Sequence, residues 1–320
     1  MSKKIGVVLL NLGGPEKQAD VEPFLYNLFS DRKIIRLGPK FMQKPIARFI
    51  AHRRAPKSAR SYALIGGGSP LNRITGEQGQ ALADSLAEYG DFQVDMAMRY
   101  WQPSAGETLA KLAGQGIKRL VALTLYPHYS RATTGSSLDD LRQVLAAAHP
   151  DMELLEIASW PDQPDYVGCL ARTITEGLAA MDNEAQLVYS AHSLPVSFIK
   201  EGDPYLLEMD KTIRGIEKIT GISGKLCFQS RSGPVEWLAP STPDMLRSLA
   251  GEDCKKVLMV PISFVSDHVE TLYEIDIEYG KLAKSLGLEL RRTESLNIKL
   301  EFIAGLKNLV VSACQEKGWL

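Results

Sequence analysis

The chain has 320 residues, of which 45% are hydrophobic and 23% charged, and its formal net charge is −1. This length suits two domains of ordinary size, and the balanced charge argues against a nucleic-acid-binding protein. No apolar run approaches the roughly 18 residues of a membrane span, and the apolar run that begins at Ile5 is interrupted at Asn11, too early for a secretory signal peptide. We therefore expect a soluble, cytoplasmic protein without a nucleic-acid partner.

Strand-length apolar runs alternate with segments of helical period, which indicates an α/β fold with parallel sheets. The expected strands are Ile5–Leu12, Phe92–Tyr100, Leu120–Tyr126, Leu154–Ser159, Leu187–Ala191, Leu226–Gln229, Val257–Phe264 and Leu288–Arg291. The expected helices include Gly76–Tyr89, Thr108–Ala113, Leu138–His149, Leu206–Ile219 and Leu300–Gln315.

The two halves of the chain align with each other. Pro103-Ser104 matches Pro240-Ser241, and Lys118 matches Lys255, at a constant separation of 137 positions. The first strands of the halves are 180 positions apart, so the first half carries 43 extra residues. We expect a first doubly wound lobe over residues 1–155 with an insertion at about 20–69. A second lobe over 156–304 carries the catalytic residues, and a C-terminal helix over 305–320 returns to the first lobe.

The insertion is unusually basic. Residues 32–60 contain ten Lys or Arg and no Asp or Glu, interleaved with apolar side chains such as Phe41 and Phe49. One interpretation is an amphipathic helical hairpin with a solvated basic face. The other is a lip over a cleft, whose apolar side chains meet a large flat ligand or a membrane surface while its cations meet carboxylates or anionic lipid.

His192 directly follows the expected strand Leu187–Ala191. Ligands of doubly wound folds bind at the carboxyl ends of the strands, so His192 would face a ligand cleft between the two lobes. A neutral imidazole there could accept a proton or bind a metal. The alternative is a core histidine that bonds to the backbone.

Glu270, Glu274 and Glu278 recur every four residues after the expected strand Val257–Phe264. On a helix they form one row, which suits a route for a divalent cation or for protons. The alternative for Glu270 is a capping box with Asp267 at the start of the helix.

Two turns rich in glycine or small polar residues, 66–70 and 133–137, lack the Walker lysine and the G-x-G-x-x-G spacing of nucleotide sites. We expect their backbone to approach a large ligand closely. The four cysteines have no C-x-x-C spacing, which argues against zinc, an iron–sulfur cluster or a disulfide framework.

Taken in order, the motifs along nearly the whole chain closely resemble the ferrochelatase family. The motifs are Asn11-Leu12-Gly13-Gly14-Pro15, Ile65-Gly66-Gly67-Gly68-Ser69-Pro70, Arg99-Tyr100, Tyr126-Pro127-His128-Tyr129-Ser130, Thr133-Thr134-Gly135-Ser136-Ser137, Ser190-Ala191-His192-Ser193-Leu194-Pro195, Phe228-Gln229-Ser230-Arg231, Gly233-Pro234, Trp237-Leu238 and Ser266-Asp267-His268-Val269-Glu270-Thr271-Leu272. No single motif would suffice, but the set is highly specific.

The resemblance implies a lyase with two Rossmann-like lobes that inserts Fe²⁺ into protoporphyrin IX in the last step of haem synthesis. By resemblance, His192 and Glu270 are the catalytic pair and either bind the metal or accept protons, while His268, Glu274 and Glu278 form a proton or metal relay. The implied porphyrin-binding residues are Leu12, Arg54, Tyr62, Ser69, Arg99, Tyr126, Ser130 and Trp237.

The chain departs from the cluster-bearing members of this family. It has Arg131 where they have a cysteine, and it ends at Leu320 without their cysteine-rich extension. We therefore expect no iron–sulfur cluster and no tightly bound cofactor, with Fe²⁺ as a substrate. Leu12 and Trp237 resemble the members that use protoporphyrin more than those that use coproporphyrin. The lip suggests peripheral contact with the inner membrane face.

Three rival functions stay open at this point. They are a coproporphyrin ferrochelatase, a cobalt or nickel chelatase of a sirohydrochlorin-type ring, and a non-catalytic haem carrier or bilobal solute-binding protein. The chelatase rivals generally lack the lip and the Trp237 segment, and a solute-binding protein usually requires export.

Overall fold

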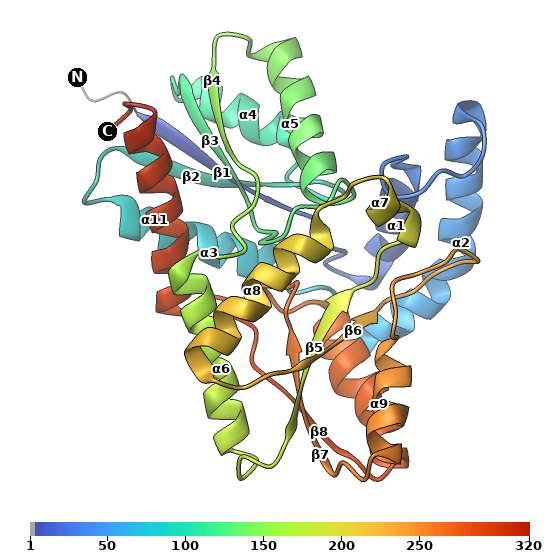
Figure 1. Cartoon of the computed structure of the whole chain (residues 1–320). Helices are drawn as coiled ribbons and strands as arrows, with labels where there is room; N and C mark the ends of the chain where they lie inside the picture. Colours follow the sequence, from blue (N-terminus) through green and yellow to red (C-terminus); the bar gives the residue numbers. More distant parts are fainter. Residues whose placement is uncertain (1–3) are drawn as a thin grey trace. The chain divides into compact units, whose positions relative to one another are not determined.

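The computed structural model describes residues 4–320 and divides the chain into two compact units. Unit 1 combines the chain up to Trp160 with Ile298–Leu320, and unit 2 is Pro161–Asn297. Figure 1 shows helices around a small sheet in each unit. The units are described one at a time below.

The sheet of unit 1 has four parallel strands in the order β2-β1-β3-β4. The central strand β1 is buried along its whole length, which explains its unbroken apolar sequence. The strands are β1 (Ile5–Asn11), β2 (Phe92–Met98), β3 (Arg119–Thr124) and β4 (Glu153–Ile157).

Helices α4 (Ala105–Gly114) and α5 (Thr134–Ala148) supply apolar side chains to a core shared with β1 and β3. The C-terminal helix α11 (Leu300–Glu316) contacts α3 (Leu71–Leu86) and β4, so the end of the chain belongs to unit 1.

The insertion forms two helices that contact each other, α1 (Val21–Ser30) and α2 (Gln43–Ala63), with the short 3₁₀ turns η1 (Gln18–Asp20) and η2 (Lys40–Met42) before each. Ala47, Ala51 and Ala55 are buried at four-residue spacing along α2. Small side chains on one helical stripe permit a close approach of the helices and leave the basic side chains outside.

Unit 2 repeats this arrangement with the parallel order β6-β5-β7-β8. Its strands are β5 (Gln186–His192), β6 (Lys225–Gln229), β7 (Lys256–Pro261) and β8 (Glu289–Arg292). Its helices are α6 (Pro164–Ala179), α7 (Val196–Lys200), α8 (Tyr205–Thr220), α9 (Thr242–Gly251), α10 (Gly280–Ser285) and the π-helix η3 (Glu270–Tyr279).

The prediction of an α/β fold with two parallel sheets is confirmed, and the strands lie within about three residues of the expected ranges. The main local difference is η3, where the four-residue spacing of the acids predicts an α-helix and the structure has a π-helix. Local periodicity does not distinguish the two, because π segments arise from surrounding packing and often occur at functional sites.

Among residues 4–320, no helix combines the length and the apolar character that crossing a bilayer would require.

Candidate functional site

The polar cluster of unit 2 lies where three chain segments end at the same edge of the sheet. His192 is the last residue of β5 and pairs in register with Gln229, the last residue of β6. The segment after β7 leads into η3, which begins at Glu270. Parallel strands present their carboxyl ends at one edge, so these residues come together although they are far apart in sequence.

His192 and Glu270 form a direct contact. The Nδ1 atom of His192 lies 2.8 Å from Oε2 of Glu270, and the His192 side chain is 38% exposed. Two contacts hold the histidine backbone in place, because its N–H donates to Ser263 Oγ at 3.0 Å and its carbonyl accepts from the Tyr205 hydroxyl at 3.1 Å. The ring is therefore oriented by Glu270 while part of it stays accessible.

Glu270 and Glu274 are linked by two residues from the end of β6. The Ser230 hydroxyl lies 3.1 Å from Glu270 Oε2 and also contacts Glu274 Oε2. Gln229 Nε2 donates to the Glu270 carbonyl at 3.0 Å and to Glu274 Oε2 at 3.1 Å. The result is a continuous hydrogen-bonded cluster of His192, Glu270, Ser230 and Glu274.

The pKa values of the central pair shift in opposite directions. Burial alone would lower the pKa of His192, but the Glu270 carboxylate raises it above its usual value. Burial alone would raise the pKa of Glu270, but His192, His268 and the Ser230 hydroxyl hold it well below its usual range. Each partner thus favours the charged form of the other.

Glu274 behaves differently from Glu270. Burial, together with the negative charge of Glu270, raises the pKa of Glu274 to about 7. Two neighbouring carboxyls with separated pKa values are an arrangement that suits one fixed charge and one exchangeable proton near neutral pH.

His268 lies beside this cluster. Its Nε2 is 4.0 Å from Glu270 Oε2, and its Nδ1 is 3.0 Å from the Ser266 carbonyl oxygen. Burial lowers the pKa of His268. The ring of Phe264 lies 4.5 Å from that of His268 and 6.5 Å from that of His192, measured between centroids, and thus lies beside both imidazoles.

The capping-box alternative for Glu270 is wrong. The Glu270 carboxylate bonds to His192 and Ser230, whereas Asp267 accepts from the side chains of Ser295 and Thr271. Of the three acids in the row, Glu278 alone is exposed and has no contact with the cluster described here.

Trp237, a predicted porphyrin contact, is also in unit 2. It forms an isolated antiparallel bridge with Pro195, three residues after His192, and its side chain is partly exposed. The segment after β5 is thus tied to the Trp237 segment on the same side of unit 2.

Arg99 belongs to a separate polar cluster in unit 1. Its Nη2 is 3.0 Å from Asp31 Oδ2, and its Nε donates to Ser136 Oγ at 2.8 Å. The Tyr100 hydroxyl donates to Asp31 at 2.7 Å, and the Ser136 hydroxyl also contacts it. Asp31 follows α1 and thereby attaches the insertion to the sheet of unit 1.

The remaining predicted porphyrin contacts are spread over unit 1. Arg54 is exposed on α2, Tyr62 is buried near the end of the same helix, and Ser130 is buried in the loop before α5. Leu12, Ser69 and Tyr126 are half-buried.

Ser69 and the first glycine-rich segment lie against the loop after β1. The Ser69 N–H donates to the Pro15 carbonyl at 2.7 Å. A Cβ atom at Gly68 would lie 2.0 Å from the Glu16 carbonyl oxygen, and one at Gly14 would lie 2.6 Å from the Ser69 Cβ. At Gly68 the close approach is therefore to the chain itself, whereas a Cβ at Gly66 or Gly67 would have no atom within 4 Å, and the approach of this backbone to a ligand stays a prediction.

Gln229, Ser230, Ser263 and Tyr205 have contacts in the cluster that sequence reasoning did not assign. Their position in the sequence could have identified two of them, since Gln229 and Ser230 stand at the carboxyl end of the strand that pairs with β5. Ser230 also adopts a left-handed backbone with φ of +64°, which is uncommon for a serine and aims its hydroxyl at the acids.

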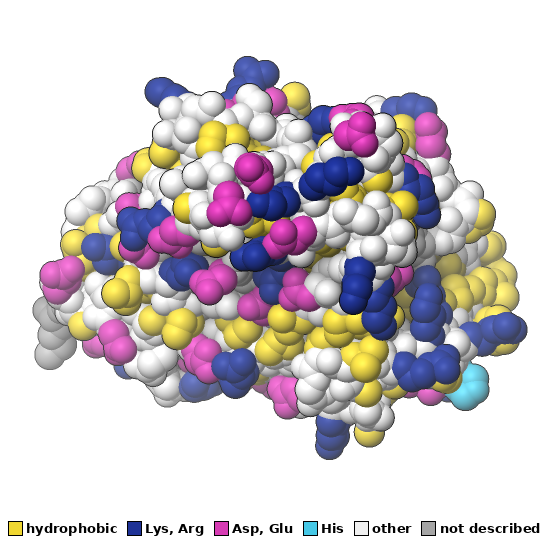
Figure 2. All heavy atoms as spheres, turned by 90° about the horizontal axis from the view of Figure 1, so that it is seen from below, with side chains coloured by type: hydrophobic (Ala, Val, Ile, Leu, Met, Phe, Trp, Pro, Cys, Tyr) yellow, Lys and Arg dark blue, Asp and Glu magenta, His cyan; other side chains and the backbone are white. Residues whose placement is uncertain are grey.

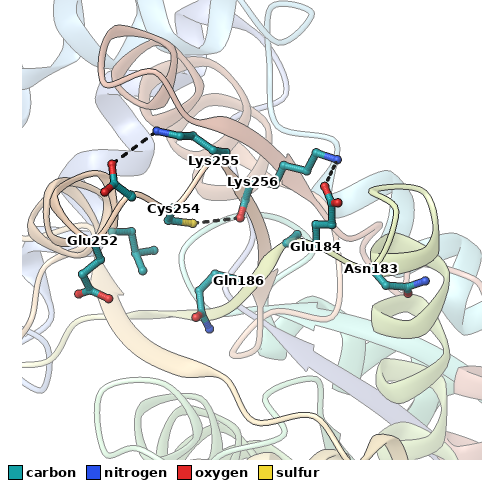
Figure 3. A pocket seen from close by; sticks show the side chains of 10 residues that line it. Asn183, Glu184, Gln186, Glu252, Cys254, Lys255 and Lys256 are labelled. Carbon is teal, nitrogen blue, oxygen red and sulfur yellow. Dashed lines mark hydrogen bonds and ion pairs between the residues drawn. The ribbon is translucent and has the colours of Figure 1, made fainter.

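A cavity of about 490 Å³ lies at the other end of the unit 2 sheet, where β5 and β7 begin (Figure 3). Its charged side chains compensate one another, since Lys256 Nζ lies 2.8 Å from both Asp182 and Glu184. This cavity is separate from the His192 cluster because Gln186 and His192 are opposite ends of β5.

Within the described part of the chain, no three His, Cys, Asp or Glu side chains are grouped so that they could hold a metal ion. Contact of His192 and Glu270 with iron remains a prediction.

Comparisons with known proteins agree on one family. The sequence model described as ferrochelatase matches residues 4–314. The ferrochelatase of Desulfotalea psychrophila is 59% identical over 309 residues, which cover 96% of this chain and 97% of that protein. The ferrochelatase of Geotalea uraniireducens is 52% identical over 314 residues and covers 97% and 98%.

Two solved structures show the same fold at low sequence identity. SirB from Bacillus subtilis with Fe³⁺ aligns with a TM-score of 0.59 at 10% identity and covers 99% of this chain and 98% of that chain. CbiX, the terminal enzyme of sirohaem biosynthesis in denitrifying bacteria, aligns with a TM-score of 0.53 at 12% identity and covers 96% and 99%. These likenesses support the chelatase-like arrangement of two parallel sheets.

Proposed function

Because the chain belongs to the ferrochelatase family, we propose that it inserts Fe²⁺ into protoporphyrin IX and releases two pyrrole protons, as the last step of haem synthesis. The observation that carries the catalytic assignment is the 2.8 Å contact between His192 Nδ1 and Glu270 Oε2 at the carboxyl end of β5. A metal-inserting enzyme needs a base for the pyrrole protons and negative charge for the cation, and this pair supplies both.

We assign His192 as the base that accepts a pyrrole proton. Its Nδ1 is engaged by Glu270, which leaves Nε2 as the ring nitrogen with a free lone pair in the neutral state. The Glu270 carboxylate stabilises the imidazolium that forms, in the same sense in which it raises the pKa of His192. The negative charge of Glu270 therefore favours proton transfer from the porphyrin to His192.

Glu274 is proposed to carry protons away from the pair. With a pKa of about 7 it can gain and lose a proton near neutral pH, and the Ser230 hydroxyl connects it to Glu270. His268 and Glu278 are proposed as the further members of this relay. Contact of Fe²⁺ with His192 or Glu270 before insertion is part of the same proposal.

The porphyrin contacts are proposed at Leu12, Arg54, Tyr62, Ser69, Arg99, Tyr126, Ser130 and Trp237. Arg99 would act with its neighbour Asp31, because the pair fixes the arginine before any substrate binds. The half-exposed side chains of Leu12, Tyr126 and Trp237 offer apolar and aromatic surface to a flat ring.

The direct test is His192→Ala, assayed by spectrophotometric insertion of Zn²⁺ or Fe²⁺ into protoporphyrin IX. Turnover should be lost while protoporphyrin binding, followed by fluorescence, stays close to wild type. His149→Ala, at the end of α5 in unit 1, is the matched control. Wild-type turnover in His192→Ala would reject His192 as the base.

The same assay decides between the proposed substrate and its rivals. Protoporphyrin should be metallated in preference to coproporphyrin, and Fe²⁺ in preference to Co²⁺ supplied with a sirohydrochlorin-type ring. A haem carrier would bind porphyrin tightly without any turnover.

We propose that the protein has no tightly bound cofactor and no iron–sulfur cluster. Cys169, Cys227 and Cys314 are buried, and Cys254, which lines the cavity at the start of β5 and β7, is partly exposed. Protein purified without oxygen should lack the visible absorption of an iron–sulfur cluster, and iron and sulfide analysis checks this.

We propose that η2 and α2 contact the inner membrane peripherally, from its cytoplasmic face. Phe41 is 79% exposed and Phe49 60% exposed, and Arg53 lies over the Phe49 ring at 5.7 Å. Figure 2 shows hydrophobic side chains bordering Lys and Arg at the right of the view, over α2. Apolar side chains among cations are typical of interfacial helices on anionic lipid.

Sedimentation with anionic vesicles tests the membrane proposal. The wild type should bind at low salt and be released by high salt, and a Phe41→Ser/Phe49→Ser double variant should bind less at every salt concentration. Absence of wild-type binding at low salt would remove the proposal without affecting the chemistry at His192.

A further inference from the structure

Arg292, the last residue of β8, binds two residues of the segment that carries the acids of the site. Its Nε and Nη2 each lie 2.8 Å from one carboxylate oxygen of Asp276, inside η3. Its Nη1 lies 3.2 Å from Asp267, which precedes the helix. The Arg292 side chain is only 12% exposed, whereas that of Asp276 is 37% exposed.

The two anchor points bracket the residues of the site. Asp267 and Asp276 stand before and after His268, Glu270 and Glu274 in the sequence. Asp276 is two residues beyond Glu274, and residues so spaced on a helix face different sides. Arg292 therefore holds the helix from outside while Glu270 and Glu274 face His192 and Ser230.

The Asp267 anchor is itself fixed on several sides. Its carboxylate accepts from Ser295 Oγ at 2.7 Å and from Asn297 Nδ2 at 2.9 Å, and its N–H donates to the Asn297 carbonyl oxygen of the side chain at 2.9 Å. Burial opposes ionisation of Asp267, but these bonds and Arg292 hold its pKa below the usual range. The start of η3 is thus attached to the segment that follows β8.

We propose that Arg292 is a positioning residue for metal insertion. By binding Asp267 and Asp276 together, it sets the place of Glu270 and Glu274 relative to His192. A planar guanidinium is suited to this task because it binds one carboxylate with two parallel hydrogen bonds and has a further donor for a second, which a lysine ammonium cannot reproduce. This inference rests on the proposed function and adds to it a residue that does not touch the substrate.

The test compares Arg292→Gln with Arg291→Gln in zinc insertion into protoporphyrin IX. Arg292→Gln should lower kcat on the order of 10- to 100-fold while KM for protoporphyrin stays within about twofold, because a misplaced catalytic group slows the chemistry without removing ring contacts. Arg292→Lys should recover part of the lost kcat. Arg291 is the neighbouring control, since it is exposed and pairs with Glu289 at 2.8 Å.

A second variant keeps the proposal open to refutation if Arg292→Gln does not fold. Asp276→Asn, which removes the bidentate pair from the helix side, should lower kcat by a similar factor. The double variant should be no slower than Arg292→Gln alone, because the arginine change already removes the contact with Asp276. Wild-type kcat in Arg292→Gln, or in Asp276→Asn where the arginine variant is unfolded, overturns the positioning role. An inactive wild type would instead contradict the proposed function.

Discussion

The sheets of unit 1 and unit 2 have equivalent strand orders, but different side chains stand at the carboxyl ends of their strands. Leu10 pairs with Thr124 in unit 1, as Ser190 pairs with Pro261 in unit 2. These registers place Leu12 at the position of His192. The N–H of Met98 donates to Pro103, as that of Phe228 donates to Pro240, so Arg99 and Tyr100 correspond to Gln229 and Ser230.

The segments after the third strand of each sheet differ just as clearly. At the constant separation of 137 positions, Thr133 and Ser137 of unit 1 correspond to Glu270 and Glu274 of unit 2. In unit 1 this region is the regular helix α5, and in unit 2 it is the π-helix η3. The fold fixes where polar groups converge, and the residues at those positions decide which chemistry results.

The charges are balanced differently in the two clusters. Arg99 in unit 1 is compensated by Asp31, which comes from the insertion that unit 2 lacks. In unit 2, Glu270 is matched by His192, and Glu274 next to it has a raised pKa. The unit 1 cluster attaches α1 through a charge pair, while the unit 2 cluster is the one proposed to carry exchangeable protons. This difference makes the comparison testable.

Neutralising Glu270 should have the largest effect. Glu270→Gln keeps the shape of the side chain but removes the charge that stabilises a protonated His192, so turnover should fall on the order of 10²- to 10⁴-fold. Zinc insertion into protoporphyrin measures this. Glu252→Gln, an exposed carboxyl paired with Lys225 at 2.7 Å, is the control. A loss smaller than tenfold would remove Glu270 from the catalytic pair.

Neutralising Asp31 should affect stability in unit 1. The Asp31 side chain is 8% exposed, and Asp31→Asn leaves Arg99 partly buried without its main partner. The free energy of unfolding should fall by about 3 kcal/mol, measured by urea denaturation. Asp139→Asn, at a more exposed carboxyl, should cost less than about 1 kcal/mol. Equal small effects would show that the Asp31 cluster does not anchor the insertion.

The sequence was sufficient to predict the strands and the place of His192 at the end of β5. A buried parallel strand is a continuous apolar run, and the residue at which the run ends can be read from the sequence. The row of acids was predicted from spacing alone, and the structure brings Glu270 and Glu274, but not Glu278, into the cluster with Ser230. The link from Ser230 to Glu274 and the pairing of Asp31 with Arg99 join residues 44 and 68 positions apart, and local patterns do not specify such partners. The π-helix and the left-handed Ser230 backbone likewise depend on packing around them.

Glu274 should make the stability of the protein depend on pH. Its folded pKa of about 7 lies above the ordinary 4.5, so the folded state binds a proton that the unfolded state releases in this range. The stabilisation by protonated Glu274 is complete below pH 4.5 and is lost as the pH rises through 7. His192, with its raised pKa, loses its contribution in the same direction.

Glu274→Gln isolates the carboxyl's share of this effect. Between pH 5 and pH 8.5 the wild type should lose roughly 2 kcal/mol more unfolding free energy than the variant does. Urea denaturation across this range measures it. Parallel pH profiles for the two proteins would show that Glu274 is ionised throughout and cannot be the proton carrier of the cluster.

Glu278 should give the smallest effect, because it marks where the row of acids reaches solvent. It is exposed on η3, in contrast to Glu274, which bonds to Gln229 and Ser230. Glu278→Gln should therefore change turnover by less than about threefold, since exposed charges interact weakly across water and salt. Measuring the rate at low and high salt sharpens the test, because a role in attracting Fe²⁺ would appear only at low salt. A loss as large as that of Glu270→Gln would mean that the working cluster extends along the whole helix, and that the contrast between buried and exposed acids does not govern the chemistry.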